Sequence, residues 1–129
     1  MLNKLKNIFS SGGAKPSAAL TTQTSSFAPK QPLYIIGDVH GCATLLDKML
    51  DRIEAHGVTH SVVNPMLILV GDYIDRGPQS AQVLERIYTL QQDTPDRVIC
   101  LMGNHEKMML DFIDDPAGRG NRWLTFGGG

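Results

Sequence analysis

Cysteine, long apolar runs and surplus charge of one sign are all scarce in this 129-residue sequence. Its two cysteines, Cys42 and Cys100, are too few for a disulfide framework and favour a reducing, cytoplasmic location. No apolar run approaches the roughly 18 residues that span a bilayer, so we expect no membrane-spanning segment. Twelve basic residues face 13 acidic ones, and a net charge of −1 lacks the basic surplus of a nucleic-acid-binding protein. What remains is an ordinary globular domain of average composition.

The charge divides the chain into two parts. Residues 1–30 contain four lysines and no acidic residue, and they are rich in Ser, Thr, Ala, Gly and Pro from residue 10 onward. Such a segment cannot bury enough apolar surface to offset its ordering entropy, so we expect a flexible basic tail or linker. The first nine residues have apolar side chains at helical spacing: Leu2, Leu5, Ile8 and Phe9. They could instead form a short helix that docks on a membrane surface or on a partner protein.

Residues 31–129 show a regular alternation of apolar runs and helical periodicity. The apolar runs, which we expect to be strands, cover 33–36, 66–70 and 98–102, and each is followed by glycine within one residue. The expected helices cover 42–56, ending near Gly57, then the segment between Pro78 and Pro95, and His105 to about Ile113. This β-α-β-α-β-α order predicts an α/β fold with parallel strands that are buried on both faces.

Polar residues follow all three apolar runs. The first run leads into GDVHG, with Asp38 and His40, and the second leads into GDYIDRG, with Asp72. The third leads into GNHE, with Asn104 and His105. Asp38 and Asp72 are 34 residues apart, and Asp72 and Asn104 are 32 apart, so each step is one strand and one helix. Because parallel strands end at the same edge of a sheet, we expect these side chains to lie together.

This donor set is suited to divalent metal ions. Carboxylate, imidazole and amide ligands favour borderline ions such as Mn²⁺, Fe²⁺ or Zn²⁺ over thiolate-preferring ones. Asp72 belongs to the middle motif, and its two carboxylate oxygens could bridge a pair of metals. Two metals about 3.5–4 Å apart can stabilise both oxygens of an in-line displacement at phosphorus and activate a shared water molecule. The pattern therefore predicts a metal-dependent phosphoester site.

Three further residues complete the expected chemistry. Arg76 carries a forked, permanently charged guanidinium that suits a pair of phosphate oxygens. His105 could protonate a leaving oxygen, and Asp75 could hold its imidazole in the required tautomer.

GDVHG, GDYIDRG and GNHE resemble the three N-terminal signature motifs of the metallophosphoesterases, and most closely those of the phosphoprotein phosphatase branch. The resemblance implies a β-α-β-α-β unit that forms about half of a four-layer α/β/β/α sandwich. It implies that Asp38, His40 and Asp72 hold one metal and that Asp72 and Asn104 contribute to the second. It further implies that His105 is the general acid. Mn²⁺ is the expected metal, with Fe, Zn and Ni as alternatives.

The expected reaction is hydrolysis of phosphate monoesters by attack of a hydroxide held between two metals. The expected substrate is a phosphorylated protein or a small phosphoester, and we favour a phosphoserine or phosphothreonine protein. Symmetrical diadenosine tetraphosphate hydrolases share the first motif and are the alternative. Asp75 and Glu106 favour the protein phosphatase, because those hydrolases tend to carry a less acidic second motif and Asp after Asn-His.

The resemblance covers residues 33–129 and matches about the N-terminal half of a phosphatase. In the family, two histidines downstream of GNHE complete the second metal site, and His56 and His60 match no family motif. A catalytically incomplete fragment or a non-catalytic module is therefore a further alternative. Arg119 and Arg122 lie in a Gly-rich stretch, which we expect to be a loop that could cover the site. We expect the 129-residue chain by itself to be poorly soluble, because open sheet surfaces invite aggregation.

Overall fold

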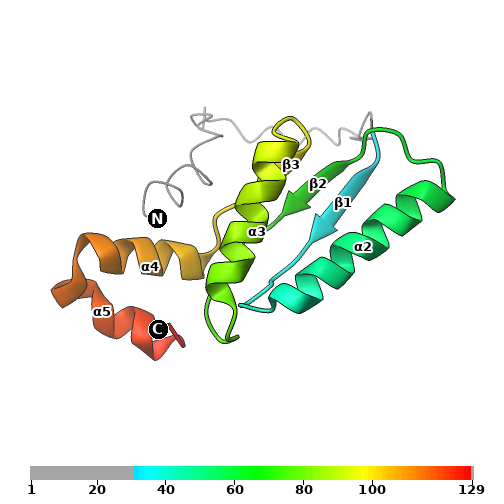
Figure 1. Cartoon of the computed structure of the whole chain (residues 1–129). Coiled ribbons are helices and arrows are strands. Elements are labelled where there is room, and N and C mark those ends of the chain that lie inside the picture. Colours follow the sequence, from blue (N-terminus) through cyan, green and yellow to red (C-terminus); the bar gives the residue numbers. More distant parts are fainter. Residues whose placement is uncertain (1–30, 129) are drawn as a thin grey trace, which may run out of the picture.

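The computed structural model describes residues 31–128 (Figure 1). Three strands and four helices follow one another in this order: β1 (Leu33–Ile36), α2 (Ala43–Thr59), β2 (Met66–Leu69), α3 (Ser80–Asp93), β3 (Val98–Cys100), α4 (Asn104–Asp114) and α5 (Pro116–Thr125). The predicted tail, residues 1–30, and the last residue of the predicted domain, Gly129, lie outside the described residues.

The three strands form one parallel sheet in the order β1-β2-β3. Ile36 pairs with Leu69, and Leu69 pairs with Cys100, so all three strands end at nearly the same level. This register confirms the predicted α/β architecture with parallel strands. It also places the three polar segments after the strands along one edge of the sheet.

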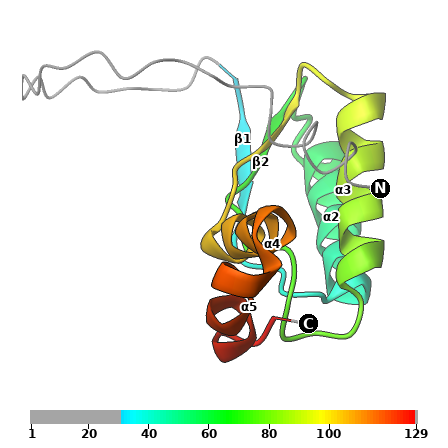
Figure 2. The same ribbon diagram turned by 90° about the vertical axis from the view of Figure 1, so that its left-hand side faces the viewer.

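Helices α2 and α3 cover one face of the sheet (Figure 2). The core lies between these two helices and the strands, and it continues into the segments after β1 and β2. Its fully or nearly fully buried side chains are Val39, Ala43, Leu46, Leu69, Tyr73, Ile74, Val83, Ile87 and Val98. Two of them, Tyr73 and Ile74, belong to the second polar motif, so the core directly anchors the candidate site.

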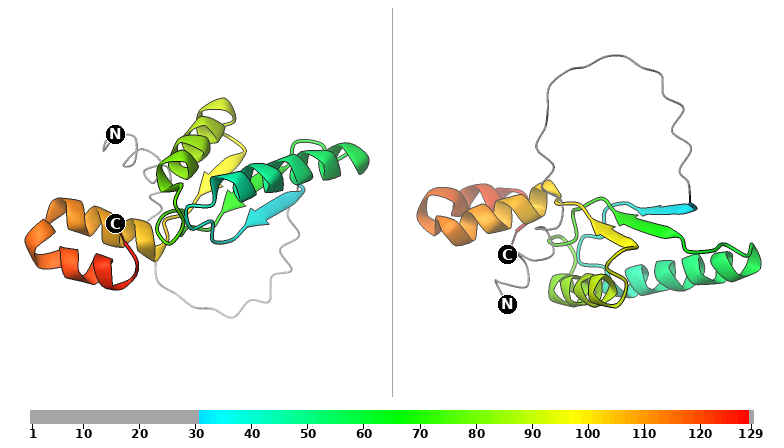
Figure 3. Two further views of the ribbon diagram at one scale, coloured as in Figure 1. Left: turned by 60° about the horizontal axis from the view of Figure 1, so that its bottom comes forward. Right: turned by 90° about the horizontal axis from the view of Figure 1, so that it is seen from above.

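Within residues 31–128 the other face of the sheet is open, so the predicted burial on both faces is not met there, whereas the open sheet surface expected for half of a sandwich is present. Leu33, Ile35 and Ile99 are exposed, and Ile35 is 62% exposed. Helices α4 and α5 do not cover this face. They pack against each other beyond the ends of the strands (Figure 3).

Helix α2 ends at Thr59, two residues beyond Gly57, which confirms the predicted end near Gly57 to within two residues. One prediction needs correction. Arg119 and Arg122 lie on helix α5 and not in a loop. Pro116 stands in the first turn of α5, and Asp115 Oδ1 accepts a hydrogen bond from the Gly118 N–H at 3.0 Å. None of the helices between residues 31 and 128 is long and apolar enough to cross a membrane.

Candidate metal centre and catalytic dyad

Backbone hydrogen bonds connect the loop after β1 to the loop after β2. The N–H of His40 donates to the Asp72 carbonyl at 2.9 Å, and the N–H of Gly41 donates to the Tyr73 carbonyl at 2.8 Å. Gly41 has a φ of +65°, and a Cβ at this position would lie 2.4 Å from the Gly77 carbonyl oxygen. Only glycine permits so close an approach of the two loops.

Four non-glycine residues of these loops have left-handed backbone conformations. Their φ angles are 43° at His40, 53° at Asp72, 68° at Asp75 and 65° at Arg76. Each such conformation costs on the order of 1–3 kcal/mol and persists only where the surroundings enforce it. All four residues carry side chains of the predicted site, which indicates that the loops are shaped to aim these side chains.

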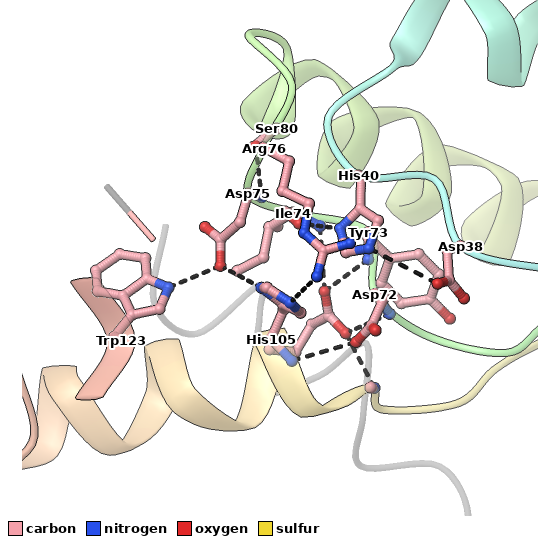
Figure 4. Close-up of polar contacts among 12 residues, drawn as sticks. Asp38, His40, Asp72, Tyr73, Ile74, Asp75, Arg76, Ser80, His105 and Trp123 are labelled. Atoms are coloured by element: carbon pink, nitrogen blue, oxygen red, sulfur yellow. Dashed lines mark hydrogen bonds and ion pairs between the residues drawn. The ribbon is translucent and has the colours of Figure 1, made fainter. Parts of the chain in front are cut away.

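Three side chains meet at the carboxyl edge of the sheet. His40, Asp72 and His105 each offer a donor atom, and these atoms all lie within 4.8 Å of one another (Figure 4). His40 Nδ1 lies 3.0 Å from the Ile74 carbonyl oxygen and donates to it, so in the neutral ring Nε2 has the lone pair. Within residues 31–128, His40 Nε2 is a buried nitrogen without a hydrogen-bond partner. A divalent metal would satisfy it, so these residues fit a metal ion.

Asp38 borders this cluster, whereas Asn104 shares no hydrogen bond or ion pair with its side chains within residues 31–128. The exposed Asp38 carboxylate has Oδ2 3.7 Å from His40 Nε2. Asn104 is the first residue of α4, is exposed, and lines an open pocket of about 350 Å³ together with Arg122. Of the predicted ligands, His40 and Asp72 therefore share the tight cluster, Asp38 borders it, and Asn104 lies beside His105 in sequence.

The predicted acid and its orienting carboxylate are in contact. His105 Nδ1 donates to Asp75 Oδ2 at 2.8 Å, and the two side chains are 1% and 5% exposed. The contact leaves Nε2 of His105 directed toward the Arg76 guanidinium, whose Nη2 lies 3.5 Å away (Figure 4). Arg76 itself is exposed. A buried His–Asp pair can hold or release a proton at its second ring nitrogen.

A tryptophan extends this dyad, and sequence reasoning assigned it no role. Trp123 Nε1 on α5 donates to Asp75 Oδ2 at 2.8 Å, so one carboxylate oxygen accepts both the imidazole and the indole. Only the position of Trp123 in a Gly-rich segment hinted at a special environment. The contact depends on α5 folding back along α4, which the sequence reading took for a loop.

Glu106 organises the backbone around the site. Its Oε2 accepts from the N–H groups of Asp72 at 2.8 Å and Gly103 at 2.9 Å. Its Oε1 accepts from Tyr73 at 2.7 Å and Ile74 at 3.2 Å. The side chain is fully buried, so these four donors are what make its burial tolerable. Glu106 thus supports the loop that carries Asp72 and does not point at the cluster as a further ligand.

Beneath the site, burial suppresses the ionisation of two residues. Burial raises the pKa of Tyr73 well above its ordinary value, and its hydroxyl lies 2.9 Å from the Leu69 carbonyl and 2.8 Å from that of Leu101. Burial also raises the pKa of Cys100 to about 12. The Tyr73 hydroxyl and the Cys100 thiol are therefore uncharged at physiological pH.

The chain is similar to two groups of curated enzymes. It is 38% identical over 77 residues to the symmetrical bis(5'-nucleosyl)-tetraphosphatase of Wigglesworthia glossinidia, over 60% of this chain and 25% of that enzyme. It is 36% identical over 77 residues to the enzyme of that name from Pseudomonas fluorescens, over 60% and 24%. It is 35% identical over 96 residues to serine/threonine-protein phosphatase 2 of Escherichia coli, over 74% and 38%.

The chain spans about a quarter of the length of the two tetraphosphatases and somewhat more of the phosphatase. The model of the calcineurin-like phosphoesterases matches residues 31–128, which is the whole of the described domain. This match includes the parallel sheet, the His40–Asp72–His105 cluster and the His105–Asp75 dyad. The chain therefore belongs to the calcineurin-like phosphoesterase family.

Proposed function

We propose that the complete natural polypeptide containing this chain hydrolyses phosphate monoesters, with phosphoserine and phosphothreonine proteins as its substrates. The observation that carries the proposal is the buried His105–Asp75 pair at 2.8 Å, beside the clustered donor atoms of His40 and Asp72. A proton donor next to a metal site is what cleavage of an unactivated phosphoester requires, because the leaving alkoxide is a strong base.

We propose that the complete polypeptide binds two divalent metal ions and that these are Mn²⁺. Asp38, His40 and Asp72 would hold one ion, and the free, buried Nε2 of His40 supports this assignment. Asp72 and Asn104 would contribute to the second. When bound, the ions would lower the pKa of a water molecule and offset the charge of the phosphate.

The remaining steps fall to side chains of this chain. The exposed, forked guanidinium of Arg76 would bind two phosphate oxygens and orient the ester. His105 would donate the proton on Nε2 to the leaving oxygen while Asp75 retains the Nδ1–H in a hydrogen bond. Asp75 thereby keeps the ring orientation constant through the reaction.

Dinucleoside tetraphosphates are the second candidate substrate. The named tetraphosphatases are slightly more identical to the chain, but the Escherichia coli phosphatase aligns over 74% of it, against 60% for each tetraphosphatase. The longer alignment favours the phosphoprotein. We also propose a cytoplasmic location, which agrees with the two free cysteines, Cys42 and Cys100.

The test is a substrate panel on the complete natural polypeptide, purified with Mn²⁺. We expect faster turnover of phosphoserine and phosphothreonine peptides than of diadenosine tetraphosphate, and the reverse ranking would favour the second candidate. Asp72→Asn should abolish turnover and lower the bound metal. The number of bound metal ions per chain is a separate criterion. About two ions per chain would support the proposed enzyme. One ion or none, without turnover, would indicate a non-catalytic module.

A further inference from the structure

We propose that Trp123 is a positioning residue for the proton-donating dyad, acting on His105 through Asp75. This inference rests on the proposed function, because it assigns Trp123 a part in the protonation of the leaving group. It starts from one observation: the indole N–H and the imidazole Nδ1–H both donate to Asp75 Oδ2, each at 2.8 Å (Figure 4).

The environment of Asp75 makes the second donor important. The Asp75 side chain is 5% exposed, so water has little access to its carboxylate. A buried carboxylate needs hydrogen-bond donors to remain charged and to hold one orientation. Besides His105, the indole is the donor to this carboxylate among the described residues. Without it, the carboxylate could rotate or draw in water, and the imidazole would lose its fixed direction.

The indole is itself held in place from two sides. The ring of Phe112 on α4 lies against it, with the ring centres 5.0 Å apart and the planes tilted by 39°. On the other side the chain passes so close that a Cβ on Gly128 would lie 2.1 Å from Trp123 Nε1. The Gly128 N–H also donates to the Trp123 carbonyl at 3.0 Å. Helices α4 and α5 and the segment after α5 therefore hold the Trp123 indole N–H in a fixed position.

The position of Trp123 in the chain agrees with such a role. Trp123 and Asp75 are 48 residues apart, and α5 makes its main contacts with α4 and not with the sheet. An indole packed on Phe112 could direct its polar edge at solvent, but here it is directed at the Asp75 carboxylate. Two contacts of 2.8 Å, from the indole to Asp75 and from Asp75 to Nδ1, thus connect α5 to the imidazole of His105.

The test compares two variants of the complete natural polypeptide. Trp123→Phe removes the N–H donor and keeps an aromatic ring, whereas Phe112→Leu disturbs the same packing and leaves the donor in place. We measure kcat and KM on p-nitrophenyl phosphate, whose leaving group needs little protonation, and on phenyl phosphate, whose leaving group needs more. Loss of dyad alignment should lower kcat selectively on phenyl phosphate, because general acid catalysis matters most for the more basic leaving group.

We expect Trp123→Phe to lower kcat on phenyl phosphate about tenfold, with p-nitrophenyl phosphate changed less than about threefold and KM little changed. Phe112→Leu should affect both substrates equally. Equal losses on both substrates in Trp123→Phe, or no loss at all, would overturn the proposal. Replacement of Trp123 by its benzothienyl analogue, which keeps the shape and lacks the N–H, should reproduce the selective loss.

A second readout keeps the two proposals separable. If the unaltered protein hydrolyses no phosphoester, the proposed function fails. The role of Trp123 is then judged by NMR, with the indole N–H resonance assigned from its loss in Trp123→Phe. An intact Trp123–Asp75–His105 chain requires the His105 Nδ1–H resonance to shift or broaden in Trp123→Phe and to stay in place in Phe112→Leu. An unchanged His105 resonance in Trp123→Phe would overturn the positioning role.

Discussion

Glu106 Oε2 accepts a hydrogen bond from the Asp72 backbone N–H at 2.8 Å, and so joins the start of α4 to the loop after β2. The same oxygen accepts from Gly103 at the start of α4, so one carboxylate sets the spacing of the second and third motifs. Asp72 has a left-handed φ of 53°, a conformation that needs such support. The buried glutamate is therefore a structural requirement for the donor cluster.

Glu106→Gln should lower the free energy of unfolding by about 2–4 kcal/mol. Glutamine keeps the shape, but its amide nitrogen cannot accept, so two of the four backbone N–H groups lose their acceptor. The measurement is urea unfolding of the complete natural polypeptide. Glu54→Gln, at an exposed position on α2, is the matched control and should lie within about 0.5 kcal/mol of the unaltered protein. Equal stability of the two variants would refute this role of Glu106.

His105→Asn should separate chemistry from metal binding. Because Nδ1 of His105 is committed to Asp75, we expect turnover to fall by about 10²–10⁴-fold while metal content falls far less. Turnover of a phosphopeptide and bound metal per chain are measured on the same samples. His60→Asn, at the exposed end of α2, is the control and should change neither quantity. Parallel losses of metal and turnover in His105→Asn would instead make His105 a ligand, as its place in the three-residue cluster permits.

The open sheet face should make residues 1–129 aggregate when they are expressed alone. Ile35 is 62% exposed on this face, so Ile35→Thr should raise the soluble fraction while keeping a β-branched residue in β1. The soluble fraction after centrifugation and the sedimentation profile give the result. Leu69→Thr, at a fully buried position of β2, should lower it. A soluble, cooperatively unfolding monomer without any substitution would contradict the expectation.

Cys100 should resist alkylation in the folded protein. Burial raises the pKa of its thiol to about 12, so at pH 8 almost none of it is the reactive thiolate. Unfolding returns the pKa to about 8.5, and the reaction should then accelerate strongly. Iodoacetamide labelling with and without urea, followed by peptide mass spectrometry, measures this difference. The same rate in both states would show that Cys100 is accessible in the folded chain.

Much of the site could be predicted from sequence because its residues stand at strand ends. Three apolar runs followed by Asp38, Asp72 and Asn104 require these residues to share one edge once the strands are parallel. His105 and Asp75, which were predicted to pair, lie 2.8 Å apart. The catalytic roles of His105, Asp75 and Arg76 stay predictions. So do the ligand roles of Asp38, His40, Asp72 and Asn104.

Helix α5 and the open face of the sheet could not be read from local patterns. A stretch with Gly118 and Gly120 has weak helix propensity, and α5 exists because Asp115 caps it and α4 packs on it. An apolar strand has the same sequence pattern whether one face of its sheet is covered or both. The run of apolar residues indicates a tendency to be buried, and it does not identify the element that covers the sheet.

By itself, the sequence determined the order of the elements from β1 to α4, the parallel sheet and the edge at which the polar motifs gather, because these follow from periodicity and chain direction. Only the tertiary structure decided which atoms meet. The free Nε2 of His40, the four donors on Glu106 and the indole on Asp75 all depend on contacts between segments far apart in the chain. Such contacts are set by packing and by the pairing of buried polar groups, which no local pattern encodes.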